Sequence, residues 1–191
     1  TYAVSYKNKP VVLSSALGVS LKDKTALVNH FEVTGTTTHA VNETWKPVLG
    51  EQAQIVNHYN ELIVALVQKD SKVKLNLVFR AFDEGVAFRY DFPKQENLNY
   101  FIISDEKTEF NLTENNKVLW IPGDFDSNEY VYNETKFSEI DNEKLNLNNG
   151  IGVKSIPGKY TVQTPLQMKS PSGLYLNIFE AAVVNYPVMH L

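Results

Sequence analysis

The chain has 191 residues, of which 43% are hydrophobic and 12% aromatic, so it can bury about two-thirds of its unfolded surface in one large core or two small ones. Its 18 Lys and Arg against 22 Asp and Glu give a net charge of −4, which argues against nucleic acid or an anionic membrane surface as a partner. Because there is no cysteine, thiol catalysis, disulfides and thiolate metal sites are excluded, and any metal must be held by oxygen or histidine ligands.

Apolar residues recur at every second position along most of the chain, a pattern that predicts half-buried β-strands. The fold class expected from this pattern is all-β. Outside the clearest hairpin, strands are predicted at 2–6, 10–13, 17–21, 28–38, 55–68, 100–110, 117–121, 159–169 and 174–180.

The clearest hairpin covers residues 73–92. In VKLNLVF, the residues at odd positions from 73 to 79 are all apolar and share one strand face, and the sequence DEG at 83–85 is a turn signal. The returning strand is GVAFRYDF, and Pro93 ends it because proline has no N–H to donate to a neighbouring strand.

This many strands exceeds the roughly ten that one open sheet usually holds, so the expected architecture is a large antiparallel sandwich of two sheets. The polar stretch 138–150, SEIDNEKLNLNNG, is expected to be an exposed loop or a short helical excursion. No run approaches the roughly 18 apolar residues of a membrane span.

The first residues of the chain alternate in polarity and the last ones are apolar without a polar tail, so both ends look cut inside structure. We therefore expect a fragment of a longer chain.

The loop WIPGDFDSNEY, which follows a predicted strand, is the first candidate site. It is either a structural turn or a loop that contacts a sugar or a neighbouring domain, since functional residues concentrate on loops carried by rigid scaffolds. Its candidate residues for binding a substrate or a neighbouring domain are Asp124, Asp126, Asn128 and Glu129. An EF-hand calcium loop is disfavoured, because that motif needs Gly where Glu129 stands and Glu where Thr135 stands.

The second candidate is Glu180, in the strand sequence LYLNIFE. It lies in phase with Leu174, Leu176 and Ile178, so its carboxylate projects on the same side as an apolar stripe. A buried carboxylate needs a partner, which can be a cation, backbone N–H groups or water at the end of the strand. A strand end that reaches solvent is an equally good interpretation of the pattern.

The remaining chemistry-bearing residues form no recognisable motif. The histidines at 30, 39, 58 and 190 lack the spacing of a zinc site, so none is predicted. Arg80 and Arg89 are predicted to form ion pairs or to pack, rather than to bind a substrate.

Five blocks of the sequence resemble the N-terminal domain of glycoside hydrolase family 97, in the family's order. They are ETWKPVLGE from Glu43, HYNEL from His58, FRAFDEGVAFRYDFP from Phe79, WIPGDFDSNEY from Trp120 and SGLYLNIFEAAVVNYPVMHL from Ser172. The blocks span nearly the whole chain and none is a common motif, so the resemblance is specific.

The resemblance implies an N-terminal β-super-sandwich of galactose-mutarotase-like fold, followed in the family by a catalytic (β/α)₈ barrel and a smaller C-terminal β domain. Residues 1–191 are then most of the first domain, and the barrel and the C-terminal domain lie outside this chain. Because the family's catalytic residues are on the barrel, the resemblance places none in this sequence.

For function, the resemblance implies an exo-acting hydrolase of α-glucosides or α-galactosides, secreted or periplasmic in a bacterium. In the family, a Glu in the block matching FEAAVVNYP joins barrel glutamates around a calcium ion beside the substrate pocket, and that position is Glu180 here. Calcium binds six to eight oxygens, so this domain gives only one of the carboxylates. The loop of Asp124 is expected to face the barrel or the pocket rim.

Two alternatives stay open. One is an autonomous carbohydrate-binding module, in which solvent-facing Trp45, Trp120 and Tyr130 form a stacking platform for sugars. The other is a purely structural β domain that braces the barrel and binds no ligand.

Overall fold

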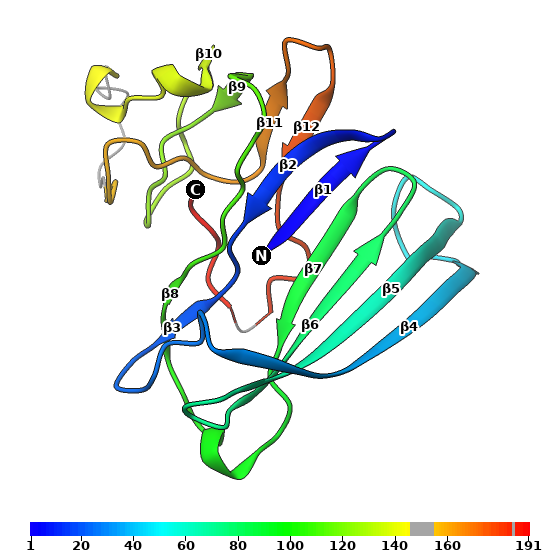
Figure 1. Ribbon diagram of the computed structural model, residues 1–191. Helices are drawn as coiled ribbons and strands as arrows, with labels where there is room; N and C mark the ends of the chain where they lie inside the picture. Colours follow the sequence, from blue (N-terminus) through cyan, green and yellow to red (C-terminus); the bar gives the residue numbers. More distant parts are fainter. Residues whose placement is uncertain (146–154, 185) are drawn as a thin grey trace. The chain divides into compact units, whose positions relative to one another are not determined.

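The computed structural model of the protein describes residues 1–145, 155–184 and 186–191. Its regular elements are strands and short 3-10 helices, which confirms the all-β prediction (Figure 1). The strands are β1 (Tyr2–Tyr6), β2 (Lys9–Ser15), β3 (Val19–Leu21), β4 (Phe31–Trp45), β5 (Ile55–Gln68), β6 (Lys74–Ala81), β7 (Val86–Asp91), β8 (Ile103–Glu106), β9 (Lys117–Trp120), β10 (Asn133–Lys136), β11 (Leu166–Lys169) and β12 (Tyr175–Ile178). The helices are η1 (Glu96–Leu98), η2 (Phe137–Glu139) and η3 (Asn142–Lys144).

The strands form antiparallel sheets within two compact units. Unit 1 comprises Thr1–Ala3 and Ser14–Phe110, and unit 2 comprises Val4–Leu13 and Asn111–Leu191. Unit 1 contains a sheet of order β4-β5-β6-β7 and the pair β3-β8, unit 2 contains a sheet of order β10-β9-β11-β12, and β1 pairs with β2. Among the described residues, no helix is long and apolar enough to span a bilayer.

The predicted hairpin is confirmed in unit 1 as β6 and β7. Phe79 pairs with Phe88 in the register, and the turn closes with a 2.8 Å hydrogen bond from the Phe82 N–H to the Gly85 carbonyl oxygen. The core of this unit gathers apolar residues from strands and connections that are distant in sequence: Val19, Leu21, Leu27, Val73 and Leu98.

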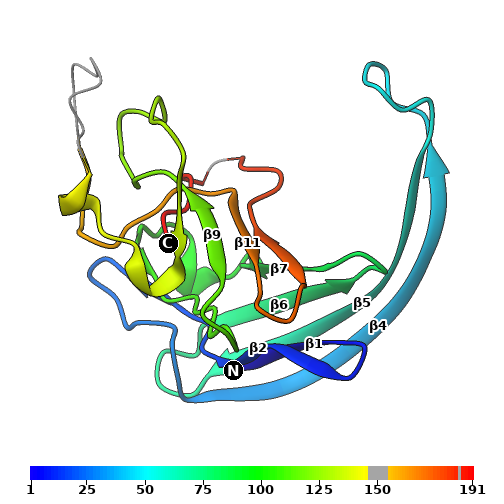
Figure 2. The same cartoon turned by 90° about the horizontal axis from the view of Figure 1, so that it is seen from above.

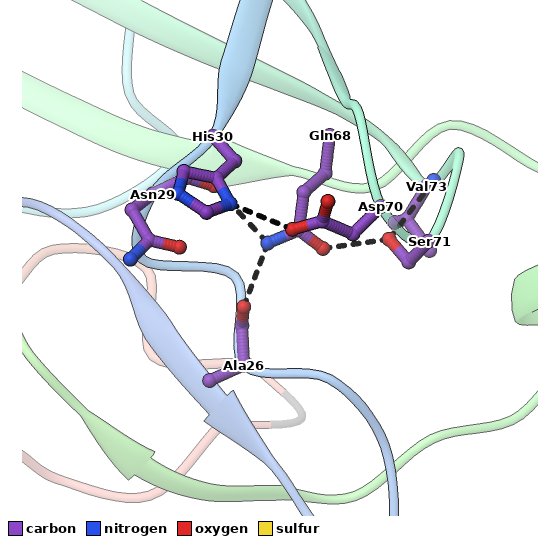
Figure 3. Close-up of polar contacts among 7 residues, drawn as sticks. All are labelled: Ala26, Asn29, His30, Gln68, Asp70, Ser71 and Val73. Atoms are coloured by element: carbon purple, nitrogen blue, oxygen red, sulfur yellow. Dashed lines mark hydrogen bonds and ion pairs between the residues drawn. The ribbon is translucent and has the colours of Figure 1, made fainter.

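A buried polar side chain, Gln68, fixes the turn between β5 and β6 (Figure 3). Its Nε2 donates to the carbonyl oxygens of Ala26 at 2.8 Å and Asn29 at 3.1 Å, while its Oε1 accepts from the Ser71 hydroxyl at 2.6 Å. Full hydrogen bonding makes its burial tolerable. The turn is thereby tied to the connection between β3 and β4.

The core of unit 2 lies on one face of the second four-stranded sheet. It consists of apolar residues from β9, β11 and the segments around them: Val118, Trp120, Ile140, Val162, Leu166 and Met168. Leu176 and Ile178 of β12 pack against this cluster.

Several predicted strand limits are wrong. The strands expected at 100–110 and 159–169 are reduced to β8 and β11, and β4 continues seven residues past the predicted end at 38, to Trp45. β10 was not predicted, because its sequence NETK has no apolar alternation. It forms through backbone pairing with β9, which sequence periodicity does not register.

The stretch predicted as an exposed loop, 138–150, is partly buried. Ile140 belongs to the core of unit 2, and Asp141 and Asn142 are also buried, so the expectation of exposure is wrong for these residues. The predicted helical excursion is confirmed by η2 and η3, and the part of the stretch from 146 to 150 lies outside the described residues.

Candidate functional site

Both candidate segments lie in unit 2, where the first loop leaves the end of β9. The loop begins with a close backbone approach: the Gly123 N–H donates to the Thr161 carbonyl oxygen at 2.9 Å. A Cβ atom at Gly123 would lie 3.0 Å from the Thr161 Cβ, so only glycine fits without displacement of Thr161.

Asp124 is the centre of this loop, and the chain itself satisfies its carboxylate. Its side chain is buried, and Oδ1 accepts from the backbone N–H groups of Asp126 at 2.8 Å and Ser127 at 3.2 Å. Oδ2 accepts from the Tyr130 hydroxyl at 2.5 Å and from the Ser155 N–H at 3.1 Å. Burial works to raise the pKa of Asp124, but the hydrogen bonds from Tyr130 and the backbone outweigh it and hold the pKa below its usual value of 3.8.

Tyr130 is the counterpart of Asp124 at the far end of the loop. Burial of the phenol, together with its hydrogen bond to Asp124 and the charge of that carboxylate, raises the pKa of Tyr130 to about 12. The phenol therefore stays protonated and donates to Asp124 throughout the neutral range. The two side chains close the loop on itself.

The other three candidates of the loop, Asp126, Asn128 and Glu129, are exposed. The Asp126 carboxylate accepts a short hydrogen bond from the Ser155 hydroxyl. Since both oxygens of Asp124 already accept hydrogen bonds from the protein, they are not available as the first ligands of an EF-hand-like site. The exposed residues are thus displayed on a loop that Asp124 organises.

Glu180 lies just beyond β12, and the predicted phase of this segment is confirmed. Even-numbered residues from 174 to 180 are partly buried and odd-numbered ones from 175 to 179 are exposed. The Glu180 Oε2 accepts from the Met189 N–H at 2.7 Å and from the Thr164 hydroxyl at 3.4 Å. Of the partner types that the sequence left open, a backbone N–H donor is the one present in the described part of the chain.

The two candidate segments form hydrogen bonds with two residues that are adjacent in sequence, Gln163 and Thr164. The Gln163 Nε2 donates to the Ser127 carbonyl oxygen at 2.7 Å and to the Asp124 carbonyl oxygen at 3.4 Å, whereas Thr164 contacts Glu180. Sequence reasoning did not identify Gln163, Thr164 or Met189. No local pattern could have done so, because Gln163 and Thr164 contact residues at least 16 positions away and Met189 acts through its backbone N–H, which side-chain type does not reveal.

The end of the chain completes this arrangement. His190 pairs with Gln163 as an isolated antiparallel bridge, and its ring stacks on Phe125 with the ring centroids 5.3 Å apart. Val162 and Leu191 exchange two backbone hydrogen bonds of 2.9 Å. The loop of Asp124 and the segment that holds Glu180 therefore share one backbone framework.

The aromatic platform expected for a carbohydrate-binding module is not formed as predicted. Trp120 and Tyr130 are buried, with Trp120 in the core and its Nε1 donating to the Thr135 hydroxyl at 3.0 Å. Only Trp45 is exposed among the three, and it belongs to unit 1, whereas the other two belong to unit 2. The expectation of three solvent-facing rings is wrong, because the apolar alternation of β9 buries Trp120 and the bond to Asp124 turns Tyr130 inward.

Two of the remaining charged candidates, Arg80 and His30, have structural partners. Arg80 forms an ion pair with Glu61 at 2.8 Å and lies over the Tyr59 ring, which confirms its predicted role. His30 contacts Asp70 at 2.8 Å beside the Gln68 network (Figure 3). In residues 1–145, 155–184 and 186–191, no group of three or more His, Asp or Glu side chains could hold a metal ion.

Comparison with known proteins places the fold among the N-terminal domains of glycoside hydrolases. A family 97 glycoside hydrolase from Pseudoalteromonas sp. strain K8, solved with acarbose, shares 32% sequence identity and superposes with a TM-score of 0.82. A variant of that enzyme solved with panose superposes with a TM-score of 0.81. Each match covers 99% of this chain and 26% of the solved chain.

The whole chain, residues 1–191, also matches the family model described as glycosyl-hydrolase 97 N-terminal. The chain therefore belongs to the family of N-terminal domains of glycoside hydrolase family 97. A retaining alpha-galactosidase from Bacteroides thetaiotaomicron is 22% identical over 203 residues, which cover 100% of this chain and 27% of that protein. This chain thus spans about a quarter of the length of the relatives it matches.

Proposed function

We propose that this chain is most of the N-terminal domain of a periplasmic or secreted bacterial enzyme that removes terminal sugars from α-glucosides or α-galactosides. The domain braces a catalytic (β/α)₈ barrel that follows it, and a smaller β domain completes the enzyme. Glu180 contributes a carboxylate ligand to a calcium site shared with the barrel. The relatives support the activity, since one is a retaining alpha-galactosidase and others are family 97 enzymes solved with acarbose and panose.

The state of the Glu180 carboxylate is the observation that carries this proposal. Its Oε2 is held by the Met189 N–H, and no described residue donates a hydrogen bond to its Oε1. The described residues thus orient the carboxylate through Oε2 and supply no donor of their own to Oε1. A carboxylate held in place beforehand loses less conformational entropy on binding a cation.

The donor set fits a shared calcium site and not a complete one. Calcium takes six to eight oxygen ligands, and within the described ranges Glu180 belongs to no group of three or more acidic or histidine side chains that could hold a metal ion. Glu180 would hold the ion together with carboxylates from outside this chain. A bound calcium ion supplies positive charge that orients sugar hydroxyl groups.

The chain's own residues set the position of this carboxylate. Met189 N–H and Thr164 fix Glu180, and Gln163 fixes the neighbouring loop, so that the exposed Asp126, Asn128 and Glu129 are displayed from the same framework. We assign these three residues to contact with the barrel or with the substrate at the rim of the pocket.

The test is hydrolysis of aryl α-glucoside and aryl α-galactoside by the full-length enzyme, with calcium added or chelated. We expect Glu180→Ala to lower kcat by about 100-fold or more, as expected when a directly ligating carboxylate is lost. Glu134→Ala is the matched control, because Glu134 is an exposed carboxylate of the same unit, paired with Lys117. Full activity of Glu180→Ala, independent of calcium, would contradict the proposal.

A purely structural role is the second candidate, and one observation favours it. Glu180 already joins the segment after β12 to the end of the chain through the Met189 N–H. Glu180→Gln separates the two roles, because the amide oxygen still accepts that hydrogen bond but carries no charge. A structural role predicts normal activity for Glu180→Gln, whereas a metal ligand predicts a loss close to that of Glu180→Ala.

A further inference from the structure

The hairpin of β4 and β5 extends past the rest of its sheet. Pairing of β5 with β6 ends at Asn60 and Ala81, but pairing of β5 with β4 continues as far as Ile55 and Trp45 (Figure 2). In the described part of the chain, the backbone of residues 41–45 and 55–59 is thus a ribbon of two strands only. A two-stranded ribbon is marginally stable in water without further packing, so this segment calls for a partner.

The tip of the hairpin carries apolar side chains that nothing in the described residues covers. Val48 is 97% exposed and Leu49 is 88% exposed, and Trp45 and Val56 beside them are exposed as well. Trp45 is in register with Ile55 and Thr44 with Val56, so Trp45 and Val56 project from opposite faces of the ribbon. Exposed apolar side chains on both faces and at the turn mark the tip as a segment that is covered by a partner. We call residues 41–59 the arm, and residues 45–56 its tip.

The base of the arm is firmly built. Tyr59 is buried, its ring lies 5.2 Å from that of Phe82, and the Arg80 guanidinium lies 4.4 Å above it. Further out, the Asn57 amide donates to the Glu43 carboxylate at 2.6 Å. These contacts hold the ribbon in one orientation on its sheet, so the tip is presented at a defined place.

We infer that the tip of the arm is seated in an apolar depression on the catalytic part of the same polypeptide. This inference rests on the proposed function, in which this chain is joined to a catalytic domain. In the relatives, the region matched by this chain is only 26% or 27% of the protein, so most of each relative lies outside it.

The size of the tip favours the same polypeptide over a second copy. Four side chains of these types can bury about 300–500 Å², whereas a stable complex of separate proteins buries about 800 Å² on each partner. A contact within one polypeptide forms at a high effective concentration and needs no such area. The tip is therefore large enough for an interdomain contact and too small for a stable dimer.

The test is photocrosslinking in the full-length protein, with Leu49→p-benzoylphenylalanine and, as the control, Tyr100→p-benzoylphenylalanine. Tyr100 is 77% exposed in the same unit but lies outside the arm. We expect position 49 to crosslink, at submicromolar concentration and in the monomer, to residues of the catalytic barrel in the same molecule. Links to a second copy, links confined to the N-terminal domain, or no link at all would overturn the inference.

A second measurement does not depend on where the crosslinker reacts. In the full-length protein carrying Val48→Ser and Leu49→Ser, we expect amide hydrogen exchange of residues 55–59 to be at least about tenfold faster than in wild type. The control carries Val86→Ser and Tyr100→Ser, two exposed residues of the same unit. Unchanged exchange would contradict a seated tip. Neither measurement reads hydrolysis or calcium, so a failure of the Glu180 proposal and a failure of this inference are distinguishable.

Discussion

Asp124 and Glu180, two carboxylates of the same unit, differ in how the chain uses their oxygens. Asp124 accepts two hydrogen bonds on each oxygen, which fills the roughly four acceptor positions of a carboxylate. Glu180 accepts both of its described hydrogen bonds on Oε2. Burial and a cluster of polar neighbours thus mark Asp124 as a residue that builds its loop, whereas the described contacts of Glu180 are compatible with the ligand role proposed for it.

Loss of the Asp124 carboxylate is the strongest test of this difference. We expect Asp124→Asn to lower the free energy of unfolding by about 2–4 kcal/mol at pH 7, because the amide loses the acceptor for Tyr130 and Ser155. Denaturant unfolding of the full-length protein measures this. Glu143→Gln is the control, since Glu143 is an exposed partner of Lys159 and its loss should change the free energy by less than about 0.5 kcal/mol.

The pH dependence of Asp124 follows from the direction of its pKa shift. A depressed pKa in the folded state means that the stabilisation by Asp124 is fully present above the usual value of 3.8 and is lost as the pH falls through the folded-state pKa. The difference in the free energy of unfolding between wild type and Asp124→Asn should therefore become smaller only below about pH 4. If that difference in free energy stays constant from pH 7 down to pH 2, the ionised Asp124 carboxylate is not what stabilises the loop.

Tyr130 gives a smaller effect at the other end of the pH scale. Its pKa is raised to about 12, so its contribution is fully present below the unfolded-state value of 10.0 and is lost as the pH rises from there towards 12. We expect Tyr130→Phe to cost about 2 kcal/mol at pH 7 and to remove part of the loss of stability above pH 10. If wild type and Tyr130→Phe lose stability in parallel above that pH, the bond to Asp124 is not the cause.

The sequence predicted the parts of the fold that depend on local alternation. The limits of β1 and β5 and the hairpin of β6 and β7 agree with the pattern of apolar residues. The pattern failed where pairing does not need apolar side chains, as in β10 and in the polar second half of β4. Backbone hydrogen bonds to a neighbouring strand form these segments, and that neighbour is not readable from local sequence.

For the site, the sequence identified which residues are unusual but not how they are connected. The phase of Glu180 with Leu176 and Ile178 was readable, because strand geometry fixes it. The inward orientation of Asp124 was not, since it depends on Ser155 and Tyr130 meeting one carboxylate. The role of Gln163 likewise arises from contacts that bridge 36 and 39 residues, and that of Met189 from a backbone N–H, which side-chain type does not reveal.

Calcium affinity of the full-length protein, measured by titration calorimetry for wild type, Glu180→Gln and Asp124→Asn, tests the central claim most directly. We predict that Glu180→Gln weakens binding by at least about tenfold, while Asp124→Asn stays within about twofold of wild type because its oxygens face inward to the loop. Wild-type affinity in Glu180→Gln, or an equal loss in both variants, would contradict the assignment of Glu180 as the binding carboxylate and Asp124 as the structural one.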